Sequence, residues 1–179
     1  MRILSVIDEA EMSPSLDAAI REGLCLCFPA DAAVFGQTRA WHGSRPEFSV
    51  VLREAERVVA HVGVVDRTIR VGETSLRVAG VQNVFVLPEH RGRGLSGQVL
   101  QAAMAQAAAR HFEGGLLFCV PRLEKVYAAC GWHGLGVREV VRTEDGRDIS
   151  IPDKNIAMFY PLQISVFPAG LVHLRGNDW

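Results

Sequence analysis

Residues 81–96 read VQNVFVLPEHRGRGLS, and the rest of the chain can be arranged around this stretch. Residues 81–87 are mostly apolar and β-branched, which predicts a strand buried on both faces, and Pro88 ends it. From Leu95 to Ala107, apolar side chains recur at four-residue spacing, which predicts an amphipathic helix. The stretch therefore predicts a buried strand that continues through a glycine-rich loop into a helix.

The loop between the strand and the helix, Arg91-Gly92-Arg93-Gly94, suits a diphosphate group. Glycines adopt backbone angles that let successive N–H groups point into one concavity, and the start of a helix adds unpaired N–H groups. Three such bonds to a charged oxygen contribute roughly 1.5–3 kcal/mol each. Association costs about 4 kcal/mol or more, so the rest of the ligand must be held elsewhere. The alternative interpretation is an ordinary turn with solvated arginines.

The loop lacks the Lys-Ser/Thr of a P-loop and the third glycine of a dinucleotide-binding fingerprint. Its pattern, Arg-x-x-Gly-x-Gly/Ala after a strand and at the start of a helix, resembles the acyl-CoA pyrophosphate loop of the GCN5-related N-acetyltransferases (GNATs). Ser96 stands where that family has a final Gly or Ala. The resemblance implies acetyl-CoA as co-substrate, with its pyrophosphate bound by Arg91, Gly92, Arg93, Gly94, Leu95 and Ser96.

The same resemblance implies how the pantetheine arm of the co-substrate is bound. Val84, Phe85 and Val86 would pair with it through their backbone, as with an added β-strand. A local bulge would splay this strand from the next one, at 116–120, and admit the thioester. A backbone N–H in the gap would then stabilise the oxyanion of a tetrahedral intermediate.

The composition predicts a single domain over 1–179 that ends in a C-terminal tail, 161–179. A net charge of −1 argues against a nucleic-acid partner. No apolar run reaches the roughly 18 residues of a membrane span, and acids appear too early for a signal peptide. We therefore expect a cytoplasmic protein without membrane contact. Its four cysteines and six histidines lack metal-ligand spacing, so no metal is expected.

Strand and helix patterns alternate along the chain, which predicts an α+β fold of three layers, a mixed sheet with helices on both faces. The GNAT resemblance implies a mostly antiparallel, twisted sheet of about seven strands. Residues 28–43 fit either a packed helix-loop element or part of an acceptor site. Strands are expected near residues 3–7, 48–52, 58–69, 76–87, 116–120, 132–142 and 155–162, and helices after Ser13, after Gly94 and at 122–130.

Tyr127 lies on a predicted helix after the short apolar strand at 116–120, five residues before Trp132. In GNATs a tyrosine in this arrangement commonly protonates the departing thiolate. The chemistry is reasonable, because a thiol has a pKa of about 8.5 and a phenol of about 10. The alternative is a core tyrosine with a hydrogen-bonded hydroxyl.

The base that deprotonates the amine is less clear from the sequence. Some GNATs use a glutamate near the position of Gln82, acting through water. Gln82 cannot take a proton, although it could orient a water molecule. His61, on the neighbouring predicted strand, is the titratable alternative, unless it is a hydrogen-bonded core residue. The terminal carboxylate of Trp179 is another candidate partner for an amine.

Two branches of the superfamily resemble the chain in patches. The nodulation N-acyltransferases resemble it at 41–47 (WHGSRPE), 60–63 (AHVG), 71–73 (VGE) and 167–170 (FPAG). The aminoglycoside 2′-N-acetyltransferases resemble it at 84–96, at 127–132 and in a terminal tryptophan. A polycationic acceptor of the second kind would require clustered acids, for which the loops offer Asp31, Glu47, Glu73, Asp153 and Asp178.

These resemblances imply an N-acetyltransferase that moves the acetyl group of acetyl-CoA to a primary amine of a small molecule, such as an amino sugar. The amine would attack the thioester directly. The nodulation enzymes use an acyl carrier protein and have a weakened pyrophosphate motif, whereas Arg91–Gly94 is intact here. The alternatives are a longer-chain N-acyltransferase using acyl-CoA or acyl carrier protein, and a non-catalytic acyl-CoA-binding relative. GNAT relatives are frequently dimers, so the resemblance is also compatible with a homodimer.

Overall fold

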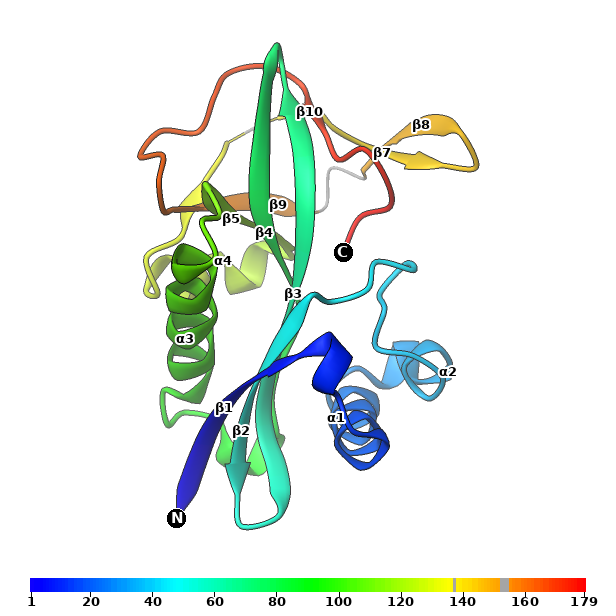
Figure 1. Ribbon diagram of the computed structural model, residues 1–179, viewed down its shortest axis with the longest axis vertical. Helices are drawn as coiled ribbons and strands as arrows, with labels where there is room; N and C mark the ends of the chain where they lie inside the picture. The colour runs from blue at the N-terminus through cyan, green and yellow to red at the C-terminus, as the bar shows by residue number, and fades with distance from the viewer. Residues whose placement is uncertain (137, 152–154) are drawn as a thin grey trace.

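The computed structural model describes residues 1–136, 138–151 and 155–179. Its centre is the long antiparallel pair of β3 (Arg57–Val71) and β4 (Thr74–Val86), shown in cyan and green in Figure 1. β2 (Phe48–Glu54) pairs with the first half of β3, and β1 (Arg2–Asp8) pairs with β2, both antiparallel. Short turns connect β2, β3 and β4 into a meander, whereas residues 9–47, which include two helices, connect β1 to β2.

On its other side β4 meets β5 (Gly114–Cys119) in the parallel direction, as a strand–helix–strand connection requires. β9 (Ile156–Pro161) is antiparallel to β5, and β6 (His133–Gly134) is antiparallel to β9. With β1 to β4 these make the mixed sheet of about seven strands that the GNAT resemblance implies. The α+β fold class is confirmed.

Within the described residues, three further short strands bring the sheet to ten. β10 (Val172–His173) pairs with the end of β3, β7 (Val140–Glu144) pairs with β10, and β8 (Arg147–Ser150) pairs with β7. The expected strand at 132–142 is thus divided between β6 and β7. These strands arise because the C-terminal tail returns to the sheet and pairs with the part of β3 that β2 leaves uncovered.

Helices cover both faces of the sheet, as predicted, with α1 (Pro14–Cys27) and α2 (Ala32–Phe35) on one side and α3 (Leu95–Ala109) on the other (Figure 1). Ser13 caps α1 by accepting a hydrogen bond from the Leu16 N–H at 3.2 Å. The helix expected at 122–130 is shorter and forms α4 (Glu124–Ala128). Short 3₁₀ turns occupy Glu9–Glu11, Pro29–Asp31, Pro88–His90 and Pro121–Leu123.

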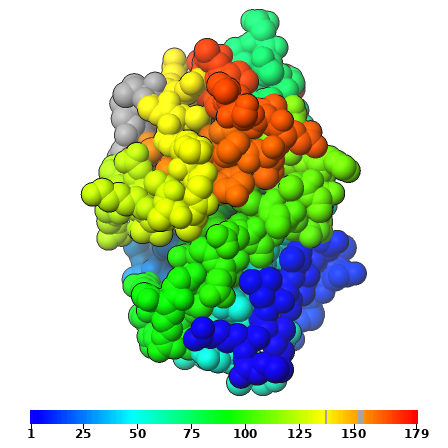
Figure 2. All heavy atoms as spheres, turned by 90° about the vertical axis from the view of Figure 1, so that its left-hand side faces the viewer, coloured from blue at the N-terminus to red at the C-terminus, as the bar shows by residue number. Residues whose placement is uncertain are grey.

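The core has two parts. The larger lies between the sheet and helices α1 and α3, and the smaller lies between the sheet and the C-terminal tail. Figure 2 shows α3 in green across one face, with the N-terminal strand below it and the C-terminal segments above. Among the described residues, no helix has the length and apolar character needed to span a bilayer.

Candidate active site

A bulge in β4 lies at the middle of the sheet. His61 pairs with Phe85 and Gly63 pairs with Gln82, so Asn83 and Val84 together face a single residue of β3. Asn83 has a φ of +55°, a left-handed conformation that asparagine tolerates better than most residues. The bulge implied by the GNAT resemblance is therefore present.

β4 and β5 separate next to this bulge. Their parallel ladder extends only from Val78 and Gly114 to Gly80 and Leu116. Beyond that point, the edge of β4 that faces β5 has no strand partner among the described residues. The two strands consequently form a V-shaped cleft, which is narrow at Gly80 and wide toward the end of β4.

A cavity of about 340 Å³ occupies this cleft. Its walls come from β4, β5, α4 and the α1–α2 region, so elements from all parts of the chain meet there. Of the predicted site residues, the cleft brings together Gln82, Val84 and Tyr127. Phe85 does not line it, because its ring is buried against Gly23 of α1.

The predicted pyrophosphate loop follows the wide end of the cleft. Gly92 and Gly94 have φ values of +73° and +70°, which glycine adopts without strain. Arg91 donates from Nε to the Val86 carbonyl at 3.1 Å. In the described structure, the N–H groups from Gly92 to Gly97 donate to no protein group. The loop is exposed, and these N–H groups are the kind of donor set that an anion requires.

Tyr127 projects from α4 and packs edge-to-face against Trp132, with ring centroids 6.4 Å apart. Burial raises the pKa of Tyr127 above its ordinary value of 10, and the neighbouring Cys119 and Cys130 raise this pKa further. Its hydroxyl makes no hydrogen bond within the described part of the chain, unlike the core tyrosine considered as the alternative. The side chain is therefore protonated at neutral pH and free to donate to a ligand in the cleft.

Gln82 is buried beside the cleft with half of its amide satisfied. Its Nε2 donates to the Ser44 carbonyl at 2.9 Å, which fixes the orientation of the amide. Its Oε1 is buried and, among described groups, has no hydrogen-bond partner. A buried acceptor without a donor is costly, so Oε1 is poised to accept a hydrogen bond from a ligand or water in the cleft.

His61 lies outside the cleft, with 0% of its surface exposed. Its Nδ1 lies 2.9 Å from the Asn83 carbonyl and its Nε2 lies 3.2 Å from the Ser49 hydroxyl. Because a carbonyl only accepts, Nδ1 carries the proton and Nε2 accepts from Ser49. Burial, with a smaller effect of the Arg39 charge, lowers the pKa of His61 from 6.5 to about 3. This environment opposes the predicted role as general base.

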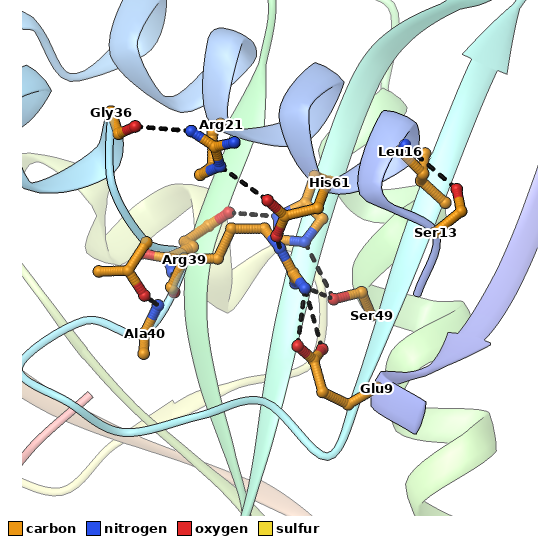
Figure 3. Close-up of polar contacts among 12 residues, drawn as sticks. Glu9, Ser13, Leu16, Arg21, Gly36, Arg39, Ala40, Ser49 and His61 are labelled. Carbon is orange, nitrogen blue, oxygen red and sulfur yellow. Dashed lines mark hydrogen bonds and ion pairs between the residues drawn. The ribbon is translucent and has the colours of Figure 1, made fainter. Parts of the chain in front are cut away.

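His61 instead belongs to a buried polar network around Arg39 (Figure 3). Arg39 donates to Ser49 at 3.3 Å and pairs with Glu9 and Asp17 at 2.8 and 2.6 Å. The Asn83 side chain donates back to the Arg39 carbonyl at 2.6 Å, which closes the network on the bulge. The network thus ties α1, β2 and β3 to the left-handed residue of β4.

Sequence reasoning missed Arg39, Ser49 and Asn83, because no motif marks them. The one available signal was an asparagine inside an otherwise apolar strand. The predicted acids are dispersed in the structure. Asp31 lines the cleft, whereas Asp178 pairs with Arg142 at 2.8 Å. Asp153 lies outside the described residues. Within the described ranges, no group of three or more potential metal ligands is present.

Comparison with known proteins identifies the family of the chain. Residues 5–175 match the family model described as nodulation protein A (NodA). The chain belongs to the NodA family. It is 30% identical to the nodulation protein A of Sinorhizobium terangae over 158 residues, which cover 83% of this chain and 74% of the relative. It is 35% identical to that of Rhizobium sp. (strain N33) over 94 residues, 52% of this chain and 45% of the relative. The alignments thus span about half to three quarters of these relatives.

Solved structures show the fold of this NodA-family chain. A GNAT family N-acetyltransferase (YhbS) from Escherichia coli, solved in complex with CoA, superposes with a TM-score of 0.68 at 16% identity, covering 97% of this chain and 89% of the other. Escherichia coli ElaA gives a TM-score of 0.64 at 16% identity, covering 89% and 99%. The GNAT fold is thereby confirmed.

Two of the patches that resemble the nodulation proteins touch in space. Gly72, in the β3–β4 turn, donates to the Leu171 carbonyl at 3.0 Å. A Cβ at Gly170 would lie only 2.9 Å from the Gly72 Cα, so Gly170 has no room for a side chain, and a Cβ at Gly72 would lie 3.0 Å from the Ala169 carbonyl oxygen. The motifs at 71–73 and 167–170 of this NodA-family chain are thus one contact that seats the C-terminal tail on the sheet.

Proposed function

We propose that the protein is an N-acyltransferase that transfers an acyl group from a CoA thioester to a primary amine of a small molecule. The observation that carries this proposal is the separation of β4 and β5 beyond Gly80 and Leu116. After its wide end come the N–H groups of Gly92 to Gly97, which have no acceptor among the described residues. Membership of the NodA family and the GNAT fold support the same reaction class.

The loop and the cleft divide the recognition of CoA between them. The N–H groups of Gly92 to Gly97 and the side chains of Arg91 and Arg93 would hold the pyrophosphate. Among the described residues, the edge of β4 at Val84 to Val86 has no strand partner on the side of β5, and its Val86 carbonyl accepts a hydrogen bond from Arg91. This edge would pair with the pantetheine arm in the manner of an added strand. Bound in this way, the co-substrate presents its thioester carbonyl inside the cleft.

Tyr127 would donate a hydrogen bond to the departing sulfur. Because its raised pKa keeps the hydroxyl protonated, donation to the developing thiolate is favoured over early loss of the proton. The bulge leaves backbone groups of Asn83 and Val84 outside regular pairing, and an N–H there would stabilise the negative oxygen during attack.

Gln82 would orient the attacking amine or a water beside it. Its Oε1 can accept one of the amine hydrogens but cannot remove a proton, so the proton must leave to solvent through water. Gln82 therefore acts in positioning, and an amine that is already neutral at the working pH would react fastest.

The acyl group is an acetyl group in the first form of this proposal, and the acceptor is an amino sugar or similar amine. Because the chain belongs to the NodA family, a longer acyl chain delivered by CoA or by a carrier protein is the second candidate. A cytoplasmic location is part of the proposal, supported by four unpaired cysteines. The cleft is built from one chain, so no second copy is required.

Release of free CoA thiol tests the proposal. The protein is incubated with acetyl-CoA or octanoyl-CoA and a panel of primary amines that includes glucosamine. Thiol release that depends on an amine, with mass spectrometry showing the acylated product, supports N-acyl transfer. Saturable CoA binding without transfer to any amine would contradict it and favour a non-catalytic acyl-CoA-binding protein.

A further inference from the structure

We propose that the indole of Trp179 closes the narrow end of the cleft and thereby limits the donor to short acyl groups. This inference rests on the proposed function, since it concerns the acyl chain of the same CoA thioester. Trp179 lies outside residues 5–175, the range that matches the NodA family model.

The indole sits where β4 and β5 part. Its Nε1 donates to the carbonyl of Leu116 at 3.2 Å, and Leu116 is the last residue of β5 in the ladder. A Cβ at Gly80, the last paired residue of β4, would lie 2.5 Å from the indole Cε2. Only a glycine at that position leaves room for the ring. Trp179 is 5% exposed and also lines the cavity, so it forms the end wall of the cleft.

The direction of the cleft brings the acyl group to this wall. The pyrophosphate loop follows the wide end, after Val86. An arm that runs along β4 from Val86 toward Gln82 therefore delivers its thioester toward the narrow end. Carbon atoms beyond the carbonyl would continue in the same direction and meet Trp179, with Phe118 beside it at a centroid distance of 5.7 Å.

Several hydrogen bonds keep the ring from moving aside. Arg67 lies over the indole, 5.7 Å from its centroid, and donates to the Asn177 carbonyl at 3.2 Å. Ser44 donates to the Asp178 carbonyl at 2.8 Å. The Ser44 carbonyl also accepts a hydrogen bond from the Gln82 side chain at 2.9 Å. Ser44 therefore connects the residues that hold Trp179 to the Gln82 amide. The end wall is therefore fixed rather than adaptable.

Binding of acyl-CoAs of different length tests the inference. Isothermal titration calorimetry compares CoA, acetyl-CoA and octanoyl-CoA on the wild type and on Trp179→Ala, Trp179→Leu and Trp179→Phe. The wild type should bind octanoyl-CoA roughly tenfold or more weakly than acetyl-CoA. Removal of the ring should reduce that ratio by roughly tenfold, with Trp179→Phe intermediate because it keeps a smaller ring.

Phe167→Ala is the matched control. Phe167 belongs to the same smaller core but does not line the cavity, so its loss should lower stability and leave the acetyl-to-octanoyl ratio unchanged. Circular dichroism establishes that each variant is folded, and Trp179→Leu keeps apolar bulk if Trp179→Ala does not fold.

The outcomes separate the inference from the proposed function. Equal affinity of the wild type for acetyl-CoA and octanoyl-CoA, or an unchanged ratio in the folded Trp179 variants, would overturn the inference while leaving the proposed function intact. Failure of the wild type to bind CoA itself would overturn the proposed function and, with it, this inference.

Discussion

Tyr127 and Tyr160 both pack against Trp132, with ring centroids 6.4 and 5.4 Å from it. Only Tyr127 lines the cleft. We expect Tyr127→Phe to lower kcat by about ten- to a hundredfold, since a hydrogen bond to a charged group contributes roughly 1.5–3 kcal/mol. The KM for the acyl-CoA should change little. Steady-state kinetics of thiol release provide the measurement.

Tyr160→Phe is the control, because it removes the same hydroxyl type outside the cleft and should leave kcat unchanged. If Tyr127→Phe turned over as fast as the wild type, Tyr127 would have no role in thiolate departure.

His61 predicts how stability depends on pH. Its pKa is about 3 in the folded protein and 6.5 unfolded, so the unfolded chain binds the proton more readily. Stability is therefore full above pH 6.5 and is lost as the pH falls toward 3. From pH 7 to pH 5 the loss should be about 2 kcal/mol. Urea unfolding at the two pH values measures it.

His61→Gln should lack this part of the pH dependence. His133→Gln provides the control, because His133 is exposed and should retain the wild-type loss. An identical loss in wild type and His61→Gln would show that His61 is not held neutral.

At the residue scale, the sequence predicted that residues from different elements share one site. Gln82 and Tyr127, on different elements, do meet in one cleft. The surroundings of His61 were not predictable, because a sequence does not reveal that both ring nitrogens of a strand histidine have buried partners. The partners Ser49 and Asn83 come from other strands, and only the sheet register brings them together.

At the scale of elements, the bulge of β4 shapes the cleft, and Asn83 stabilises the bulge twice. It accepts the left-handed φ of +55°, and its side chain donates to the Arg39 carbonyl at 2.6 Å. Asn83→Ala should therefore destabilise the protein by about 2 kcal/mol, about half from backbone strain and half from the lost hydrogen bond. Urea unfolding at neutral pH measures the change.

Asn83→Gly separates the two effects. Glycine relieves the strain but lacks the side chain that donates the hydrogen bond, so Asn83→Gly should lower the free energy of unfolding by about 1 kcal/mol. The flexibility that glycine adds to the unfolded chain is a separate, further loss. Equal stability of wild type and Asn83→Ala would contradict the account of the bulge.

The strong periodic elements were predictable. The strand at 81–87 and the helix that follows are observed as β4 and α3, because their apolar patterns match the burial that the fold imposes. The GNAT resemblance implied a bulge in this strand, but its position at Asn83 was not predictable from the sequence, since it depends on pairing with β3. The expected helix at 122–130 is shorter because a 3₁₀ turn at Pro121–Leu123 precedes α4.

At the scale of the whole molecule, the C-terminal tail has a larger part than its sequence indicated. It adds β10 to the sheet, packs Gly170 against Gly72 and delivers Trp179 to the cleft. A tail without strong periodicity gives no sequence signal for these contacts. The motifs at 41–47 and 167–170 both resemble the nodulation proteins. The first contacts the end of the tail through Ser44, and the second is the part of the tail that packs against Gly72.

The proposed function requires that the backbone N–H groups after β4 bind coenzyme A. Hydrogen–deuterium exchange with and without millimolar coenzyme A tests it directly, because these amides have no protein acceptor in the described structure. Exchange should slow in peptides covering 84–97 and remain unchanged over β8 at Arg147–Ser150. The double variant Arg91→Ala/Arg93→Ala should weaken the protection. Unchanged exchange of residues 92–97 at saturating coenzyme A would contradict the account.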